Sequence, residues 1–448
     1  MKTLDLKGLT GEIITRFSPL YTAARQEWNR GVQRFPLIIV YCENNRDVSN
    51  AVIWSRKQQV PLRIRSGGHH YEGFSIGDGV LVIDISRMNA ISFRDSMNIT
   101  VQAGVKNEQL YAYVSSRGYP FPGGTCPTVG VSGYTLGGGW GLSSRKFGLG
   151  CDSLVELEMV DYKGRILVAN EKQNSELFWA CRGAGGGNFG VVVSLTYKVP
   201  NKVNKISLIQ MEGPNLTQRL QMQFFYTWQQ WLASMDSRMT MVGRIYNALD
   251  GGYGLGGTGF FYGSKEEALR LVEPLSLGGN VQIRVEELPF YEAIQKVEAA
   301  YPPYERFKST GRFVNRTYSK REIESIISLL RQRAPGSVYA ALSLYALGGK
   351  VAEVAPEETA FFYRDAHYIM GLQSVWEDQE YKSVNVKWLE NRFPYLDRIT
   401  TGSYVNFPYS ELSDPERAYF GGNVPRLEKV KAMYDPYDVF SFPQSLSS

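Results

Sequence analysis

The stretch RIRSGGHHYEGFS, residues 63–75, holds two of the three histidines in a chain of 448 residues. A strand-like run of basic and apolar residues comes first, and two glycines separate it from the histidine pair. Glycine loops let backbone N–H groups approach an anionic ligand closely, so a strand that ends in such a loop can hold a phosphate. A single loop of this kind is weak support, because ordinary turns also use glycine.

Two further glycine clusters follow, PGGTCPTVGVSGYTLGGGWG at 122–141 and CRGAGGGNFG at 181–190. Ordinary hairpins need one or two glycines, so the runs at 137–139 and 185–187 favour ligand loops. None of the clusters matches GxxxxGK[ST], and none places GxGxxG directly between a strand and a helix with an acidic residue about 20 further on. A nucleoside triphosphate site and a Rossmann site are therefore disfavoured, and a dinucleotide held by another loop architecture stays open.

Composition indicates a globular chain of two domains. The length exceeds the size at which one hydrophobic core usually stops growing. The 49 basic and 44 acidic residues are mixed along the chain without long charge runs, so the net charge of +5 does not predict a nucleic-acid surface. Four cysteines without CxxC spacing and three histidines predict neither a disulfide framework nor a metal site.

The start of the chain predicts a soluble protein made in the cytoplasm. Asp5 and Glu12 interrupt the apolar stretch that a secretory signal would need. No apolar run approaches the ~18 residues of a membrane span, so no membrane partner is expected. Association with a surface or coat by another route stays open.

Local patterns predict an α+β chain that changes character near residue 205. The first part alternates short strands with glycine turns, and helices are expected at 45–59, capped by Asn45, and at 107–118. Strands are expected at 37–42, 61–66, 80–85, 98–104, 154–161, 165–169 and 190–199. Later units are longer, with helices at 216–235, 319–334 (Ser319 cap, Glu322 three residues on) and 423–434, and strands at 337–349 and 367–378. Helices interleaved with long strands favour an antiparallel sheet covered on one face.

Four motifs together resemble one family. They are RIRSGGHHYEGFS, GGTCPTVGVSGYTLGGGWGLSSRKFGLGCDSL at 123–154, WACRGAGGGNFGVVVSLTYKV at 179–199, and SYVNFPYSEL at 403–412 followed by YDPYDVFSFPQS. In this order they are similar to the berberine-bridge-enzyme-like FAD-linked oxidases of the vanillyl-alcohol-oxidase superfamily. The resemblance implies a PCMH-type FAD-binding domain at 1–203, a substrate domain on an antiparallel sheet at 204–401, and a segment at 402–448 that returns to the FAD domain.

The resemblance also implies how flavin is held. His69 matches the histidine bonded to the flavin 8α carbon, and Cys126 matches the cysteine bonded to C6 in doubly tethered members, as in glucooligosaccharide oxidase-type enzymes. A neutral imidazole and a thiolate are suitable nucleophiles for these carbons. We expect His70 to be a supporting neighbour and Val129 to tune the access of oxygen to the flavin. The full predicted cofactor set is His69, Cys126, Arg65, Ser66, Gly67, Gly68, His70, Thr128, Val129, Gly130, Ser132, Gly133, Gly138, Gly141, Gly187, Asn188, Val192 and Asn406.

Catalytic roles follow from the same resemblance. Tyr71 and Tyr404 resemble the tyrosines over the flavin, and Tyr404 is expected to take the hydroxyl proton of the substrate. A tyrosine with its ordinary pKa of about 10 needs a neighbouring cation or hydrogen-bond donor for this work. Gln373 is expected to reach the site from the strand at 367–373, where Gly371 aligns with the usual carboxylate or amide position.

Some positions depart from the family pattern. Tyr134 replaces a histidine that usually touches the flavin ribityl chain, Trp140 replaces a common Tyr or Phe, and Phe407 stands where some members have a polar side chain. At these positions the resemblance does not carry over the redox tuning and the catalytic detail of the family.

The predicted function is an oxygen-dependent FAD oxidase that acts on a hydroxyl group. Double tethering permits an open groove, and aromatic residues at 13% suit stacking on sugar rings, so a carbohydrate is favoured. A secondary metabolite, oxidised as an alcohol or by ring closure, is the alternative substrate class. A flavin-bearing structural or binding protein is the alternative from another class, and a nicotinamide dehydrogenase is disfavoured by the absent fingerprint. The oligomeric state is not predicted.

Overall fold

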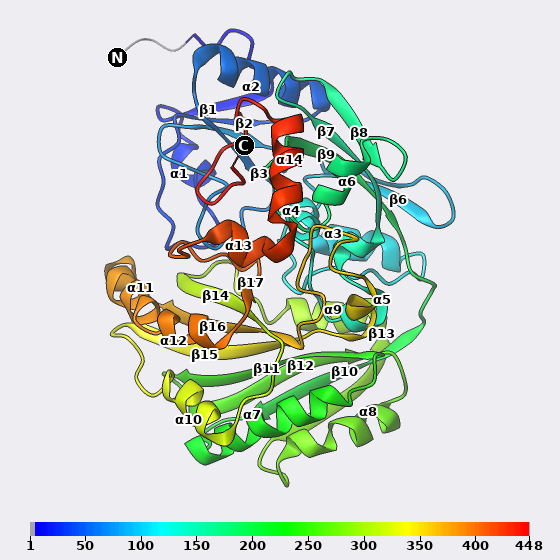
Figure 1. Cartoon of the computed structure of the whole chain (residues 1–448), viewed down its shortest axis with the longest axis vertical. Coiled ribbons are helices and arrows are strands. Elements are labelled where there is room, and N and C mark those ends of the chain that lie inside the picture. The colour runs from blue at the N-terminus through cyan, green and yellow to red at the C-terminus, as the bar shows by residue number, and fades with distance from the viewer. Residues whose placement is uncertain (1–4, 448) are drawn as a thin grey trace.

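Three β-sheets organise the chain in the computed structural model, which describes residues 5–447 (Figure 1). One sheet has the strand order β1-β2-β4-β3, the second has β5-β6-β9-β7-β8, and the third has β13-β10-β12-β11-β15-β16-β14-β17. The two small sheets use residues up to Lys198, and the large sheet begins at Lys205. We propose domain limits at 203 and 401, and the first of these lies between the last strand of the small sheets and the first strand of the large sheet.

The first small sheet carries the histidine loop. Its strands are β1 (Glu12–Thr15), β2 (Ile38–Tyr41), β3 (Leu62–Arg65) and β4 (Leu81–Asp84). β4 pairs in parallel with β2 and with β3, and helix α2 (Asn45–Gln58) makes the crossover from β2 to β3. The cap of α2 is Asn44 rather than the predicted Asn45, because the Asn44 side chain accepts from the N–H groups of Arg46 and Asp47.

The second small sheet is antiparallel throughout. Its strands are β5 (Ile91–Phe93), β6 (Asn98–Gln102), β7 (Leu154–Val160), β8 (Ile166–Asn170) and β9 (Val191–Lys198). Gly164 has a φ of 77° in the turn that joins β7 and β8 as a hairpin. Short helices lie in the connections, namely α1 (Tyr21–Ala24), α3 (Asn107–Ser115), α4 (Val131–Leu136), α5 (Ser144–Phe147) and α6 (Ser175–Ala180).

The large sheet is antiparallel, as predicted. Its strands are β10 (Lys205–Gly213), β11 (Met239–Ala248), β12 (Gly252–Phe261), β13 (Gln282–Pro289), β14 (Phe307–Val314), β15 (Ser337–Ala346), β16 (Tyr368–Trp376) and β17 (Gly402–Ser403). Helices α7 (Gln218–Ala233), α8 (Lys265–Val272) and α10 (Lys320–Ser328) lie along its lower side in Figure 1. Helices α11 (Lys382–Glu390) and α12 (Phe393–Ile399) lie at the left, where α11 contacts β14 and β16. The Ser319 and Glu322 capping box of α10 is confirmed. Helix α9 (Phe290–Glu298) packs on α3 instead, on the side of the small sheets.

The C-terminal segment joins the two parts of the molecule. β17 pairs with β14 of the large sheet, and the chain then returns through α13 (Pro415–Phe420) and α14 (Val424–Tyr434). Figure 1 shows α14 in red beside α6 and the first small sheet. No helix within residues 5–447 has the length and apolar character needed to cross a bilayer.

Lys431 fixes this returning helix in place. Its ammonium group is fully buried and donates to Asp435 and to the carbonyl oxygens of Asn188 and Phe440. We expect Lys431→Met to lower the free energy of unfolding by about 3–5 kcal/mol, because the change leaves the Asp435 carboxylate buried without its partner. Urea unfolding measures the effect. Lys429→Met on the exposed side of α14 is the control, and an equal loss in both variants would contradict this account.

Candidate functional site

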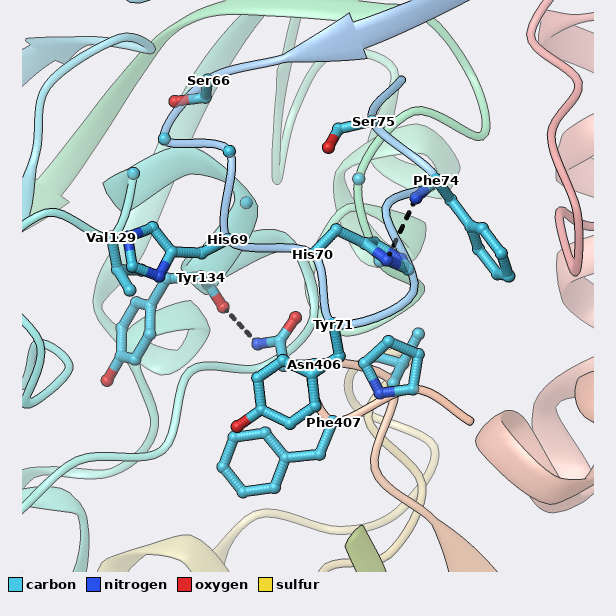
Figure 2. Close-up of a pocket in the computed structure, with 18 of the residues that line it drawn as sticks. Ser66, His69, His70, Tyr71, Phe74, Ser75, Val129, Tyr134, Asn406 and Phe407 are labelled. Atoms are coloured by element: carbon cyan, nitrogen blue, oxygen red, sulfur yellow. Dashed lines mark hydrogen bonds between the residues drawn. The ribbon is translucent and has the colours of Figure 1, made fainter. Parts of the chain in front are cut away.

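A cavity of about 620 Å³ lies where the small sheets meet the large sheet. The loop after β3, the glycine clusters and the C-terminal segment form one side, and side chains from β11, β15 and β16 form the other. Figure 2 shows the loop from Ser66 to Ser75 curving around one end of this space. The three clusters that stood apart in the sequence therefore share one cavity.

His70 closes the turn of the histidine loop. Its Nδ1 accepts hydrogen bonds from the N–H groups of Glu72 and Phe74, both at 3.3 Å, and Figure 2 marks the second. Burial lowers the pKa of His70 to about 4, so the ring is a neutral acceptor at physiological pH. The role of His70 is to hold the loop that presents His69 and Tyr71.

His69 is held as a neutral imidazole in the cavity wall. Burial and the charge of Lys106 lower the pKa of His69 to about 3. The ring stacks on Trp28 with 5.0 Å between ring centroids, and its Nε2 lies 2.8 Å from Oγ1 of Thr128. A neutral ring keeps one nitrogen lone pair for bonding, which is the state that a nucleophilic histidine needs.

Cys126 reaches the same cavity from a different loop. Its side chain is 9% exposed, and Sγ lies 3.8 Å from the same Thr128 hydroxyl. Burial raises the pKa of the Cys126 thiol, and hydrogen bonds from Thr128 and Val129 act in the opposite direction. Both residues that the sequence predicted as attachment points therefore lie in one cavity, linked through Thr128.

Two glycines join the loops that carry these nucleophiles. A Cβ added to Gly67 would lie 2.3 Å from the backbone nitrogen of Gly130, and one added to Gly130 would lie 2.4 Å from Oγ of Ser66. Backbone can approach backbone this closely only where both residues lack a side chain. The glycines at these positions fix the distance between the histidine loop and the start of α4.

Other glycines leave room that a ligand could fill. A Cβ on Gly133 would meet no atom within 4 Å, although Gly133 lines the cavity between buried neighbours. A Cβ on Gly187 would have its nearest contact at 3.5 Å, with Phe442. Missing side chains at the wall make a groove in which backbone approaches a bound group closely. This arrangement fits FAD, and His69 and Cys126 line the same cavity.

Three residues of the predicted cofactor set lie behind the wall. Arg65 is buried against Asp84, with 2.5 Å between Nε and Oδ2, and against Glu27. A Cβ on Gly138 would lie 2.6 Å from the Phe361 ring, and one on Gly141 would strike the carbonyl oxygen of Gly123. Ion pairing and chain packing account for these residues in the structure, and their place in the cofactor-binding set stays a prediction.

Thr128 also lies outside the wall but touches both attachment residues. The other predicted cofactor and catalytic residues line the cavity: Ser66, Gly67, Gly68, His69, His70, Tyr71, Cys126, Val129, Gly130, Ser132, Gly133, Gly187, Asn188, Val192, Gln373, Tyr404 and Asn406.

The hydroxyl of Tyr404 receives an unusual number of hydrogen bonds. The backbone N–H groups of Gly139 and Trp140 donate to it, each at 3.0 Å, and Nδ2 of Asn406 donates at 3.1 Å. Burial raises the pKa of Tyr404 to about 12, and these donors act in the opposite direction. A phenol oxygen has two lone pairs and a phenolate has three, so three converging donors suit the anion.

Tyr134 and Asn406 support this arrangement. The Tyr134 hydroxyl lies 2.8 Å from the carbonyl oxygens of Pro122 and Gly139 and shares its one hydrogen between them, and the carbonyl oxygen of Tyr134 accepts from Asn406 (Figure 2). The tyrosine that replaces the usual histidine therefore serves local packing through its hydroxyl.

Aromatic rings pack against one another in the cavity wall. Tyr71 stacks on Phe407 with 5.3 Å between ring centroids and 5° between ring planes, as Figure 2 shows. Phe407 also contacts the rings of Tyr345 and Tyr404. Gln373 lines the cavity from β16, while a Cβ on Gly371 would point at the carbonyl oxygen of Thr310.

Three charged residues that line the cavity were not predicted from the sequence, namely Arg63, Arg244 and Glu305. Arg244 projects from β11, and Glu305 follows α9, where burial raises its pKa to about 7 against the opposing effect of Arg244. Arg244 is the single charged residue in the run MTMVGRIYNA, which is a signal for a special role. Glu305 lies in a polar loop, where nothing distinguishes it from a surface glutamate.

Comparisons with known proteins identify the relatives of this chain. Residues 36–170 match the family model for an FAD binding domain, and residues 403–447 match the model named berberine and berberine like. The chain is 38% identical to the uncharacterized FAD-linked oxidoreductase YgaK of Bacillus subtilis, over 98% of this chain and 97% of that protein.

Two further relatives are named for their substrates. Chitooligosaccharide oxidase of Gibberella zeae is 28% identical, over 89% of this chain and 85% of that protein. A solved structure of glucooligosaccharide oxidase from Acremonium strictum, described with 6-S-cysteinyl, 8α-N1-histidyl FAD, superposes with a TM-score of 0.87 at 23% identity and covers 97% of both chains. The chain therefore belongs to the FAD-linked oxidoreductases of the berberine-bridge-enzyme-like family and has the PCMH-type FAD-binding fold.

Proposed function

We propose that the protein is an oxidase with FAD bonded to both His69 and Cys126, and that it oxidises a CH–OH group of a carbohydrate. The observation that carries this proposal is the meeting of two nucleophilic side chains from separate loops at one end of a glycine-lined cavity. Bound FAD would accept a hydride from the substrate carbon and pass two electrons to O2, giving hydrogen peroxide. The named FAD of glucooligosaccharide oxidase supports the double bond.

Tyr404 is the proposed base. Its oxygen lies in the cavity wall and accepts three hydrogen bonds, and these donors stabilise the charge left after proton loss, against the burial that raises the pKa of Tyr404 to about 12. Tyr71 and Gln373 are the proposed partners that orient the substrate hydroxyl. The side chain of Tyr71 stacks on Phe407 in the cavity wall, and Gln373 lines the cavity from β16.

A carbohydrate suits the part of the cavity next to the large sheet. Tyr71, Phe407 and Tyr345 offer aromatic faces there, and Arg244 and Glu305 offer polar groups among them. Sugars bind by stacking a ring face on aromatic side chains while convergent polar groups fix their hydroxyls. The name of the relative chitooligosaccharide oxidase supports the same substrate class.

A peroxide-coupled screen tests the substrate class. The purified protein is mixed with mono- and oligosaccharides and, separately, with aromatic and aliphatic alcohols, and hydrogen peroxide and flavin bleaching are followed. Turnover confined to sugars supports the proposal, and turnover confined to the alcohols points to a secondary metabolite. A bound flavin that no compound reduces would instead favour a binding protein with little turnover.

The glycine groove makes its own prediction about FAD binding. We expect Gly133→Leu to fold normally, because no atom lies within 4 Å of the new Cβ and the change removes a glycine from a helix. The longer side chain would enter the cavity, so the ratio of FAD to protein should fall roughly tenfold or more. Visible flavin absorbance measures the loss, and circular dichroism checks the fold. Gly133→Ala is the control that should keep its flavin, and an unchanged ratio in Gly133→Leu would contradict the placement of FAD in this groove.

A further inference from the structure

Thr128 contacts both proposed attachment residues without lining the cavity. Its Oγ1 lies 2.8 Å from Nε2 of His69 and 3.8 Å from Sγ of Cys126. The two nucleophiles come from loops 57 residues apart in the sequence (126 − 69), and this hydroxyl lies between them. A residue in this place acts on the cofactor only through its neighbours.

We propose that Thr128 is the positioning residue for double flavin attachment: its hydroxyl accepts from Nε2–H of His69 and donates to Sγ of Cys126. This inference rests on the proposed function, in which both bonds form. A hydroxyl has one hydrogen to donate and two lone pairs to accept, so both contacts form at the same time. One side chain would then prepare both nucleophiles.

The contact selects the tautomer of His69. With hydrogen on Nε2, the lone pair of the neutral ring lies on Nδ1, for which the residues between 5 and 447 provide no hydrogen-bond partner. The stacked Trp28 ring restrains the plane of the imidazole. Hydrogen-bond partners of one ring nitrogen determine which nitrogen is free to react. Thr128 and Trp28 together therefore leave Nδ1 as the bonding atom.

The same hydroxyl favours the reactive form of Cys126. A thiolate is the nucleophile, and burial together with the charge of Glu298 opposes its formation. The hydroxyl of Thr128 and the backbone N–H groups of Thr128 and Val129 oppose these effects. No Lys, Arg or His is among the groups that lower the pKa of this thiol, so these donors carry the stabilisation.

Both bonds have the same electron balance. The imidazole gives up its N–H hydrogen in one bond and the thiol its S–H hydrogen in the other, while the flavin carbon that is bonded gives up one hydrogen in each case. The two electrons released in each bond formation stay on the flavin until O2 removes them with two protons as hydrogen peroxide. O2 is the oxidant that the proposed oxidase already uses.

The first test measures attachment in three proteins, the wild type, Thr128→Val and Thr128→Ser. Each is isolated without flavin and mixed with FAD in air, and samples are acid-quenched over time. Digestion and mass spectrometry then show whether the His69 peptide and the Cys126 peptide are joined through one flavin. Valine has the shape of threonine but no hydroxyl, and serine keeps the hydroxyl.

We expect wild type and Thr128→Ser to give the joined peptides. Thr128→Val should form them roughly tenfold more slowly and accumulate singly bonded flavin, because a hydrogen bond to each nucleophile is lost. Joined peptides formed by Thr128→Val at the wild-type rate would overturn the inference. A wild type that never forms joined peptides would instead defeat the double attachment itself, so the two failures are distinguishable.

A second measurement needs no flavin and no variant. Nitrogen-15 NMR of histidine-labelled, flavin-free wild type reports the protonated nitrogen of His69, one of three histidines in the chain. Hydrogen on Nε2 supports the inference, and hydrogen on Nδ1 overturns it. Because this measurement uses the wild type, it tests the inference even if Thr128→Val fails to fold.

Discussion

The double variant His69→Ala, Cys126→Ala is expected to carry no covalent flavin, whereas each single variant keeps it by the remaining bond. The two side chains belong to different loops, and both face one cavity, so either bond can hold the cofactor when the other is absent. Intact mass after acid denaturation gives the answer directly. The wild type should show the mass of the chain plus one FAD, and the double variant the bare chain mass.

Cys181→Ala is the matched control. This thiol is 1% exposed, lies outside the cavity wall and has a pKa of about 12, raised by burial. The variant should therefore keep the mass and visible spectrum of the wild type. Loss of covalent flavin in only one single variant would mean that the residue changed in that variant holds the only bond. A wild type that remains colourless with the bare chain mass in excess FAD would remove the basis of the oxidase proposal.

The proposed attachment residues could be named from the sequence because they belong to local motifs. His69 follows a strand and two glycines, and Cys126 lies in GGTCPTVG, so each loop carries its own sequence signal. The structure adds the contact that no motif contains. Thr128 faces the His69 ring across 59 residues of chain. Only the packing of Gly67 against Gly130 makes that contact possible.

Long-range contacts explain what could not be predicted from the sequence. Arg65 stands at the end of β3, and its ion-pair partners Glu27 and Asp84 lie on other segments. Arg244 and Glu305 are 61 residues apart (305 − 244) and meet only because β11 and the loop before β14 face one cavity. Such pairings depend on strand order in the sheet, which residue patterns do not encode.

The proposed role of Tyr404 follows from the resemblance, whereas the hydrogen bonds that its oxygen accepts could not be predicted from the sequence. Its oxygen accepts from backbone groups at 139 and 140, which lie 265 and 264 residues away in the chain. The sequence analysis required a cation or a donor near this tyrosine. The structure provides donors from a glycine turn, and the cation Arg244 lies elsewhere in the cavity.

Tyr404→Phe is expected to lower kcat by about 10²–10⁴-fold while the flavin stays attached. Phenylalanine keeps the ring that packs against Phe313, Phe361 and Phe407 but cannot accept a proton. Stopped-flow measurement of flavin reduction by the best substrate isolates this step from reoxidation. Tyr409→Phe is the control, because Tyr409 is a buried tyrosine outside the cavity wall.

The pH dependence of flavin reduction distinguishes Tyr404 from Glu305 as the base. A base whose pKa is about 12 is mostly protonated at neutral pH, and its active fraction rises tenfold with each pH unit below that value. The rate of flavin reduction should therefore climb from pH 7 to 10 without a plateau in the wild type, and Tyr404→Phe should lose that slope. Asn406→Leu removes one donor to the phenolate, so it should raise the pKa of Tyr404 and lower the rate at any fixed pH in this range.

Glu305 would give a different curve. Its pKa is about 7, so a rate governed by its carboxylate would level off above that pH. A wild-type plateau near pH 8 could instead survive in Tyr404→Phe and disappear in Glu305→Gln. That result would identify Glu305, and not Tyr404, as the base. A climbing profile that disappears only in Tyr404→Phe would leave Arg244 and Glu305 to bind the substrate, because neither group would then titrate with the reaction.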